Sequence, residues 1–475
     1  MAAAVPDSEW AADANEAIHL SLVRTKEDRA SLTAREVYEG FNPTFTYPIF
    51  GEDEKLYGYK DLAVDLKFAS GSLAQYLKVS YSQKLASSSV VDDIEGTLAG
   101  FIPPGYDTNE ADFLKRVEED AATFRPYGRL IHSYSRSAHK MSRKHAHMTQ
   151  GYDPNDEDIV DFEVYHTTWD TPGFREYHRR MQLFILLYIE GGSYISEEED
   201  QWDFVVLYEK RRRRNTPDVF TYHFVGYSSL YRFYCFPEKT RMRLSQFVIL
   251  PPYQQEGHGS ALYCAIYQFV LQDASIAELT VEDPAEAFED LRDRNDLKML
   301  LNNERYLREA LGDDANGSSC ASPAHHPSPP NANGNGHNGH GGGGGGGGRV
   351  AKGRTVHHER SVQLGNGRGN QGVGRRRTLG KLGPPADRKW MEKWRTELKI
   401  AQRQFNRLNE MLILKHMDCE DGHTMKQYRL QVKQRLFRFN YDSLMQLDKE
   451  ERQTKLEETF QSVRADYERI LGTVH

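Results

Sequence analysis

The chain has 475 residues, of which 38% are hydrophobic, and a formal net charge of −8. That length suits about two to four domains, and the weak negative balance slightly favours a basic partner. The four cysteines (Cys235, Cys264, Cys320 and Cys419) are far apart and form no Cys-x-x-Cys pair, which argues against a disulfide framework and a zinc site. Met1–Asn15 lacks the pattern of a secretory signal, and no apolar run could span a membrane. We therefore expect a soluble protein that is cytosolic or nuclear.

Short apolar runs separated by Gly, Asn and Asp turns predict a small mixed β domain at the N-terminus. Phe45–Tyr47 and Leu77–Tyr81 are examples of these runs. A Pro-Pro-Gly sequence marks the end of the domain, which we place at residues 1–110. A helical pattern over Ala111–Ala121 then opens a second domain, at residues 111–311.

The second domain is predicted to contain a run of antiparallel strands followed by a strand-loop-helix-strand-helix unit. The strand candidates are Arg129–Tyr134, Asp161–Tyr165, Phe204–Glu209, Val219–Tyr227, Leu230–Phe236 and Leu244–Leu250. A helix is predicted over Pro172–Ile189, between the second and third of these strands. This order is typical of an α+β layer built on one largely buried sheet.

The composition changes sharply after Leu311. Residues 312–389 include eight consecutive glycines with His, Asn, Ser and Arg, too little apolar surface to offset chain entropy, so we predict a disordered insertion. Its basic residues are not interleaved with aromatic ones, so specific nucleic-acid binding is not expected. Apolar residues at helical spacing resume at Trp390 and predict a helical region of two or three helices over residues 390–475.

The stretch around Gln254–Ser260 is the most informative part of the chain. It follows the apolar strand Phe247–Leu250 and contains two glycines in the pattern Gln-x-x-Gly-x-Gly, ahead of a helical pattern. Such a loop directs several N–H groups to one point and binds phosphate. The pattern is equally typical of a tight turn, and it matches neither the Walker A motif nor the dinucleotide fingerprint.

A second strand and helix are predicted directly downstream. Leu279–Glu282 alternates like a strand. Asp283 and Pro284 then resemble a helix start, with Asp283 as the N-cap and Glu286 as its capping-box partner.

Several long segments, in one order from about Phe41 to Leu300, resemble the catalytic subunits of type B histone acetyltransferases, members of the GNAT superfamily. They are FGEDEKLYGYKDL, IPPGYDTNEADFL, FREYHRRMQLFILLYIEGGSYI, SQFVILPPYQQEGHGSALY and ELTVEDPAEAFEDLRDRND. The resemblance implies a GNAT core, acetyl-CoA as cosubstrate, and direct acetylation of free histone, most of all the N-terminal tail of histone four. It also implies a WD-repeat histone chaperone as partner and a location in both cytoplasm and nucleus.

Three carboxylates are candidates for catalysis. A lysine amine, with a pKa of about 10.4, must lose a proton before it attacks a thioester, and a carboxylate can take that proton without a metal. Glu282 ends the strand beside the coenzyme loop, and the resemblance implies that it is the general base; a solvated strand end is the alternative. The resemblance also implies active-site roles for Asp283, otherwise a helix cap, and for Glu190, otherwise a helix terminus.

The resemblance implies that one continuous region binds the coenzyme. Main-chain groups of Phe247, Val248 and Ile249 would pair with the pantetheine amides, although the same residues suit an ordinary core strand. N–H groups of the following loop would bind the pyrophosphate. The loop residues are Gln254, Gln255, Glu256, Gly257, His258, Gly259 and Ser260. We expect His258 to contribute its N–H and not a catalytic imidazole.

A groove for the histone tail is also implied by the resemblance. Its residues are Glu52, Asp53, Glu54, Trp202, Tyr231, Arg232 and Phe233. Carboxylates can hold the cations of the tail, and aromatic rings can cover their aliphatic stems. The alternatives are a solvated turn for the acidic residues and core packing for the aromatic ones. Two other functions stay open, a histone-binding scaffold without catalysis and an acetyltransferase for a small amine.

Overall fold

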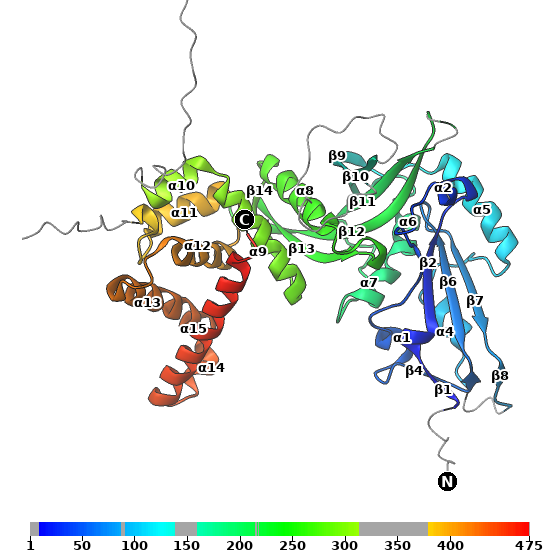
Figure 1. Ribbon diagram of the computed structural model, residues 1–475, viewed down its shortest axis with the longest axis horizontal. Helices are drawn as coiled ribbons and strands as arrows, with labels where there is room; N and C mark the ends of the chain where they lie inside the picture. Colours follow the sequence, from blue (N-terminus) through cyan, green and yellow to red (C-terminus); the bar gives the residue numbers. More distant parts are fainter. Residues whose placement is uncertain are drawn as a thin grey trace, which may run out of the picture.

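The computed structural model describes residues 9–86, 91–137, 159–213, 216, 218–312 and 379–474. Three parts follow one another along the longest axis: an N-terminal sheet, a central sheet and a set of C-terminal helices (Figure 1). One hydrophobic core runs through all three parts. No helix within the described ranges is long and apolar enough to cross a membrane.

The N-terminal part is a mixed four-stranded sheet of order β3-β2-β6-β7, in which only β2 and β6 are parallel. Its elements are β1 (Ala11–Asp13), α1 (Ala14–Ala17), β2 (Ile18–Val23), α2 (Lys26–Ala30), β3 (Glu39–Phe41), α3 (Tyr47–Phe50), β4 (Lys55–Tyr57), β5 (Tyr59–Lys60), β6 (Ala63–Ala69), β7 (Gln75–Ser80), β8 (Gln83–Lys84), α4 (Ile94–Ala99) and α5 (Glu110–Thr123). The predicted mixed β domain is thus confirmed. The strand expected at Phe45–Tyr47 is wrong, because Tyr47 begins a helix.

Helix α5 packs on the N-terminal sheet and also contacts β12 (Phe220–Cys235) of the central sheet. Its Phe113 and Val117 pack in one cluster with Val23 and Ala69 of that sheet. The predicted boundary after residue 110 therefore needs correction, because the helix covers the first sheet and the central part begins after Thr123.

The central part is a six-stranded sheet of order β14-β13-β12-β11-β10-β9. Its elements are β9 (Arg129–Ser137), β10 (Ile159–Thr168), α6 (Phe174–Met181), α7 (Leu183–Tyr188), β11 (Trp202–Arg212), β12 (Phe220–Cys235), β13 (Lys239–Ile249), η2 (Pro251–Tyr253), α8 (His258–Gln272), β14 (Ile276–Val281), α9 (Glu286–Leu301) and α10 (Glu304–Leu311). All neighbours are antiparallel except β13 and β14, which are parallel and joined through α8. This order confirms the predicted α+β class.

Helix α8 covers one face of the central sheet, and α6 with α7 covers the other (Figure 1). A Cβ at Gly259 of α8 would lie 3.7 Å from the Phe247 ring, so Phe247 points to the α8 face. Tyr227 points the other way, with its ring centroid 6.2 Å from that of His178 on α6. Side chains two residues apart in a strand share a face, so this α7 face also carries Ser229, Tyr231 and Phe233.

Two predicted strands, Val219–Tyr227 and Leu230–Phe236, are one continuous strand, β12. Ser228 and Ser229, which lie between the two predicted strands, are fully buried. Ser228 Oγ donates to the main-chain oxygen of Gln246 at 2.7 Å, and Ser229 Oγ donates to its side-chain oxygen at 3.0 Å. Because these hydroxyls are paired across the sheet, they cost little to bury.

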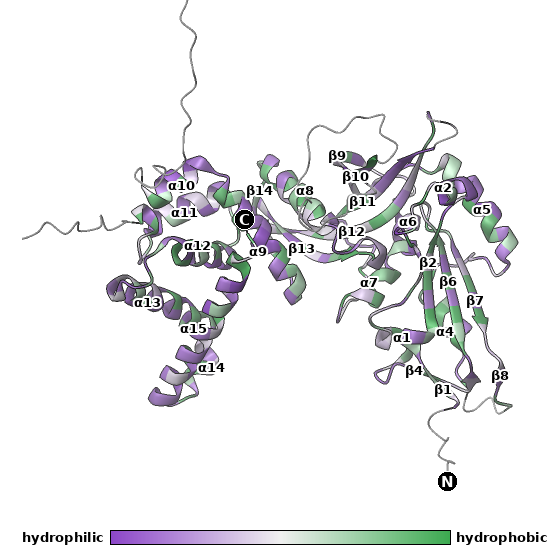
Figure 2. Cartoon of the chain, in the orientation of Figure 1, coloured by the Kyte–Doolittle hydropathy of each residue, from purple (hydrophilic) through white to green (hydrophobic). Residues whose placement is uncertain are grey.

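The C-terminal part, over residues 379–474, contains five α-helices and one short 3-10 helix, not the two or three helices predicted. Its elements are η4 (Gly380–Leu382), α11 (Arg388–Glu397), α12 (Gln402–His416), α13 (Gly422–Phe439), α14 (Tyr441–Met445) and α15 (Lys449–Leu471). Leu379 and Leu382 are buried, so residues 379–389 belong to the fold and the predicted insertion ends too late. The rest of that insertion, residues 313–378, lies outside the described residues. The outer helices α13 and α15 are mostly hydrophilic (Figure 2).

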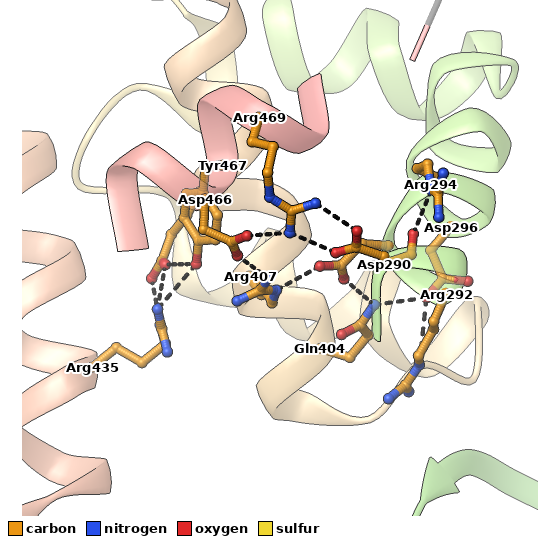
Figure 3. Close-up of polar contacts among 12 residues, drawn as sticks. Asp290, Arg292, Arg294, Asp296, Gln404, Arg407, Arg435, Asp466, Tyr467 and Arg469 are labelled. Carbon is orange, nitrogen blue, oxygen red and sulfur yellow. Dashed lines mark hydrogen bonds and ion pairs between the residues drawn. The ribbon is translucent and has the colours of Figure 1, made fainter. Parts of the chain in front are cut away.

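A polar cluster joins α9 of the central part to α12 and α15 (Figure 3). Arg407 donates to Asp293 at 2.6 Å and to Asp466 at 2.5 Å. Gln404 donates to both Asp293 and Asp296 at 2.9 Å. Three of these groups are more than nine-tenths buried, so the C-terminal helices supply the partners that the α9 carboxylates need.

Candidate active site

Glu282 lies where β14 ends beside β13. Its N–H donates to the carbonyl oxygen of Leu244 at 2.9 Å, which continues the pairing of the two strands. Its carboxylate accepts a 2.6 Å hydrogen bond from Ser245 Oγ and pairs with Arg243 at 3.3 Å. The side chain is still 46% exposed. Glu282 is therefore oriented by β13 while remaining open to water and to a substrate.

Strand β13 has a β-bulge at the residues that hold Glu282. The register of β12 and β13 shifts by one residue, which leaves Ser245 as the extra residue in β13. Arg243 is opposite Tyr231, and Gln246 is opposite Ser229. Paired residues share a face, so Arg243 and Gln246 both point to the α7 face although three positions separate them.

Glu190 lies in an exposed turn directly after α7, and this turn contacts the bulge. Gln246 Nε2 donates to the carbonyl oxygen of Ser193 at 2.8 Å, which holds the turn against β13. The N–H of Gly191 donates to the Tyr47 hydroxyl at 2.6 Å, which connects the turn to α3. The Glu190 turn and the groups that hold Glu282 therefore meet on the α7 face.

Asp283 does not cap a helix, which corrects the sequence prediction. Helix α9 begins at Glu286, with Ala285 as its N-cap and with no side-chain cap. Asp283 is exposed and has a φ of +29°, a conformation uncommon for residues other than glycine. The Asp-Pro sequence thus forms a bend between Glu282 and the helix instead of its first turn.

The acidic triplet Glu52, Asp53 and Glu54 contains one residue that supports the fold, Glu54, and two that lie at the surface. Glu54 accepts hydrogen bonds from the N–H groups of Thr46 at 2.6 Å and Tyr47 at 3.0 Å, at the start of α3. The bond from Thr46 is the main cause that lowers the pKa of Glu54. Asp53 accepts from the Tyr57 hydroxyl at 3.0 Å, and Glu52 is exposed. Because Tyr47 also bonds the Glu190 turn, the triplet lies close to that turn.

Three of the predicted groove residues form an aromatic row on the α7 face. Trp202 and Tyr231 meet edge to face at 4.8 Å, and Tyr231 and Phe233 are 4.6 Å apart between ring centroids. The Arg243 guanidinium lies 4.3 Å over the Phe233 ring. The row thus leads to the arginine that pairs with Glu282.

Arg232 does not share this surface with its two aromatic neighbours. It points to the α8 face, where it pairs with Asp203 and lies 3.9 Å from Asp273 at the end of α8. Alternation along β12 therefore separates Arg232 from the predicted groove.

The edge of β13 is open beyond the end of β14. The pairing of these strands ends at Val281 and Leu244. The N–H of Leu250 donates to Val225 of β12, so Val248 also faces β12, while Phe247 and Ile249 direct their main-chain groups to the open edge. The Ile249 oxygen there already accepts a hydrogen bond from Gln254 Nε2 at 2.8 Å, which leaves its N–H for a ligand. Two of the three predicted main-chain positions therefore point where an extended amide ligand could pair.

The loop before α8 has the geometry of an anion site. Gly257 precedes the helix with a φ of +80°, a conformation that favours glycine. The first intrahelical bond runs from the N–H of Ala261 to the oxygen of Gly257, so the N–H groups of the intervening residues have no acceptor in the helix. Gly259 has a different role, because a Cβ there would lie 2.8 Å from Leu291 of α9.

The imidazole of His258 points into the core. It is 1% exposed, and its Nδ1 lies 2.7 Å from the Tyr134 hydroxyl. Its Nε2 lies 3.5 Å from Glu256. Burial lowers the pKa of His258, which favours the neutral ring. The side chain therefore anchors the loop and leaves only the main chain free for a ligand.

A buried cluster fixes the residue before the loop, and it was not predicted from the sequence. Arg24 of the N-terminal part donates to both carboxylate oxygens of Glu209, at 3.0 and 2.7 Å, and to the Tyr253 hydroxyl at 2.9 Å. That hydroxyl donates to Glu209 at 2.7 Å. No local pattern indicates this cluster, because its members are far apart in the chain. It ties the loop to the N-terminal sheet.

Comparisons with known proteins agree with the predicted resemblance. Residues 10–190 match the family model "Histone acetyl transferase HAT1 N-terminus", and residues 380–418 match "Fungal HAT1, C-terminal". The chain is 45% identical over 471 residues to a histone acetyltransferase type B catalytic subunit from Cryptococcus neoformans var. neoformans serotype D, covering 98% of both chains. The protein of that name from Mycosarcoma maydis is 40% identical, over 91% of this chain and 83% of its own length.

More distant similarities were also found. The Homo sapiens protein of the same name is 33% identical, over 64% of this chain and 68% of its own length. Among solved structures, an aminoglycoside acetyltransferase from an uncultured soil metagenomic sample overlaps 28% of this chain and 84% of its own, at 15% identity and a TM-score of 0.20. Overlap at that level does not bear on function.

Proposed function

The chain belongs to the histone acetyltransferase type B catalytic subunits, and from this premise we propose that it transfers acetyl groups from acetyl-CoA directly to free histone four. Histone acetyltransferase activity follows from the family. The acceptor, which is the N-terminal tail of histone four, is our proposal. The observation that carries it is the position of Glu282. This carboxylate lies between the open edge of β13 and the α7 face, where acidic and aromatic side chains gather.

The residues present suit acetyl-CoA, which supplies an activated acetyl thioester. The main-chain groups of Phe247 and the N–H of Ile249 would hold the pantetheine amides along the open edge, since the Ile249 oxygen is taken by Gln254 Nε2. N–H groups of His258, Gly259 and Ser260 would hold the pyrophosphate at the start of α8. Both sets are main-chain groups, so the buried His258 side chain is compatible with this binding.

We assign the general base to Glu282. Ser245 and Arg243 orient its carboxylate, and its exposure allows it to take the lysine proton directly or through water. Glu190 would assist from the turn on the same face, and Asp283 from the bend that follows Glu282. The acetyl carbon is then attacked by the neutral amine, and the thiolate leaves.

The histone tail would cross the α7 face. Trp202, Tyr231 and Phe233 would cover the aliphatic stems of its basic residues. Glu52 and Asp53 would attract its cations, while Glu54 supports α3. The arrangement suits a long cationic peptide better than a small amine, because the contacts extend from the N-terminal part to β12.

The test is acetyl transfer to a histone-four tail peptide by the wild type and by Glu282→Gln. We expect kcat to fall by about 10²- to 10³-fold while the Kd for acetyl-CoA changes little, since the substitution removes the base and preserves size. Glu286→Gln, the same change at an exposed position of α9, is the control. Equal rates for Glu282→Gln and the wild type would remove Glu282 as the base.

The same assay separates the other candidate functions. Faster transfer to a polyamine than to the peptide would establish a small-amine enzyme. Coenzyme binding without transfer to either acceptor would establish a non-catalytic scaffold.

We also propose that the chain acts with a WD-repeat histone chaperone and occurs in both cytoplasm and nucleus. The support is the family, whose members are named as subunits. Co-sedimentation of the two purified proteins tests the partner, and fluorescence microscopy of the tagged chain tests the location. Failure to co-sediment, or restriction to one compartment, would contradict the respective proposal.

A further inference from the structure

A groove of about 1240 Å³ lies among the C-terminal helices, outside the candidate active site. Its walls come from α11, α12, α13 and α15. In Figure 1 these helices occupy the end of the molecule opposite the N-terminal sheet. None of the residues discussed for coenzyme or histone binding contributes to this groove, so it is a separate surface.

The free charges of the groove are positive. Its two carboxylates are already neutralised, since Glu392 pairs with Arg395 at 2.6 Å and Glu410 pairs with Arg435 at 2.8 Å. By contrast, Arg388, Arg403 and Arg438 line the groove and are exposed. Across the described ranges these three arginines form no ion pair. The groove therefore attracts anionic groups.

The groove also has apolar surface that water covers in the isolated chain. Helix α13 buries Tyr428, Val432 and Leu436 against its neighbours. On its groove side, Leu430 is 53% exposed, and Phe439 is 60% exposed although the Arg403 guanidinium lies over its ring, 4.1 Å from the centroid. Exposed apolar side chains beside free cations are typical of an interaction surface.

Side-chain amides of several glutamines also line the groove. They come from Gln402, Gln427, Gln431, Gln434 and Gln453. An amide side chain both donates and accepts hydrogen bonds, as the main chain of a bound peptide requires. The lining is thus suited to a polypeptide and not to a small ligand alone.

We propose that this groove binds an acidic segment of a partner protein, one that carries apolar side chains among its Asp and Glu residues. Charge complementarity selects this occupant. The chain's own tract from 349 to 378 is rich in arginine and would be repelled. A second copy in a symmetric contact would bring the same three arginines together. Nucleic acid lacks side chains that fit the apolar positions at Leu430 and Phe439.

Fluorescence anisotropy with the full chain tests the proposal. The probe is a fluorescein-labelled 15-residue peptide of Asp and Glu interspersed with Leu and Phe. We expect saturable binding that weakens at least tenfold in the Arg403→Glu, Arg438→Glu double variant and weakens with added salt. Leu430→Ala should weaken binding without altering the salt dependence, because it removes apolar contact and leaves the charges.

Two controls keep the test specific. Lys115→Glu reverses an exposed charge on α5, whose side chain is 75% exposed, and should leave binding unchanged. Acetyl transfer to the histone peptide should be unaffected in the groove variants, because they leave the candidate active site intact.

The proposal would be overturned if the acidic peptide did not bind saturably. It would also be overturned if the wild type and the double variant bound the peptide equally well. Tighter binding of a DNA duplex, lost in the double variant, would assign the groove to nucleic acid. A dimer in sedimentation that the double variant abolishes would assign it to a second copy.

Discussion

At the scale of single residues, the candidate base depends on two neighbours in β13. Ser245 Oγ donates to the carboxylate of Glu282, and Arg243 pairs with its other oxygen. Neither neighbour is expected to exchange protons with the substrate. They determine the direction of the carboxylate, so they are positioning residues.

Ser245→Ala should lower kcat by about threefold to tenfold without changing the KM for acetyl-CoA. The substitution removes a hydrogen bond to a charged group, worth about 1.5 to 3 kcal/mol, of which part is recovered from water. Ser245→Thr retains the hydroxyl and should restore most of the rate. Steady-state kinetics checks this, and an equal loss in the Ala and Thr variants would point to disruption of the bulge instead.

Tyr253→Phe should raise the KM for acetyl-CoA severalfold and leave kcat nearly unchanged. The missing hydroxyl lies between Arg24 and Glu209, and its loss loosens the residue that precedes the coenzyme loop. The free energy of unfolding should fall by about 1 to 3 kcal/mol, because buried polar groups lose a partner. Kinetics and denaturant unfolding measure the two effects.

Tyr306→Phe is the matched control for that variant. The Tyr306 hydroxyl is also buried and donates to Asn409 at 2.6 Å, but this bond links α10 to α12 and lies outside the cluster. A rise in KM as large as that of Tyr253→Phe would show that the effect is not specific to the cluster.

At the scale of elements, α9 links the candidate active site to the C-terminal helices. Its N-terminal side follows Glu282 and Asp283, and its buried side carries Asp293 and Asp296. Burial raises the pKa of Asp296 to about 6, although Tyr263 and Gln404 donate hydrogen bonds to it. We therefore expect the contact between α9 and the C-terminal helices to weaken when Asp296 ionises.

Wild type should lose stability relative to Asp296→Asn as the pH rises from about 4 to 7. An unfolded Asp has a pKa of about 3.9, so the folded state holds its proton to higher pH, and ionising the buried carboxyl above pH 6 destabilises the fold. The difference between the folded and unfolded pKa values corresponds to roughly 3 kcal/mol at most. Denaturant unfolding of both proteins across this pH range checks the prediction. A difference in unfolding free energy that stays constant with pH would refute it.

At the scale of the whole molecule, the inserted tract leaves and re-enters the fold at neighbouring points. A Cβ at Gly380 would lie 2.7 Å from the main-chain nitrogen of Gly312. The described chain on both sides of residues 313–378 is thus already joined in space. A short connection can replace the tract without moving α10 or η4.

Replacing residues 313–378 with a short glycine linker should leave catalysis on free histone within a few fold of wild type. The longer deletion 313–385 should destabilise the protein by several kcal/mol, because it also removes the buried Leu379 and Leu382. Thermal unfolding and the peptide assay compare the two deletions. Near-total loss of activity in the shorter deletion would give the tract a catalytic role.

Local patterns in the sequence were sufficient to predict much of the fold and part of the candidate active site. The strand Phe247–Leu250, the glycine loop and the end of β14 at Glu282 depend on residues close in the chain, and the structure has all three. The α+β class followed from the order of these elements. The C-terminal part has five α-helices where two or three were predicted, because short turns interrupt a continuous amphipathic pattern.

Only the tertiary structure decided how the site is assembled. The bulge at Ser245 arises from pairing between strands, and the contact of Arg24 with Glu209 joins positions 185 residues apart. Asp283 had the sequence of a helix cap, yet the turn out of β14 gave it another conformation. Hydrophobic periodicity and turn chemistry act over a few residues and are visible in sequence, whereas register and burial are set by distant partners.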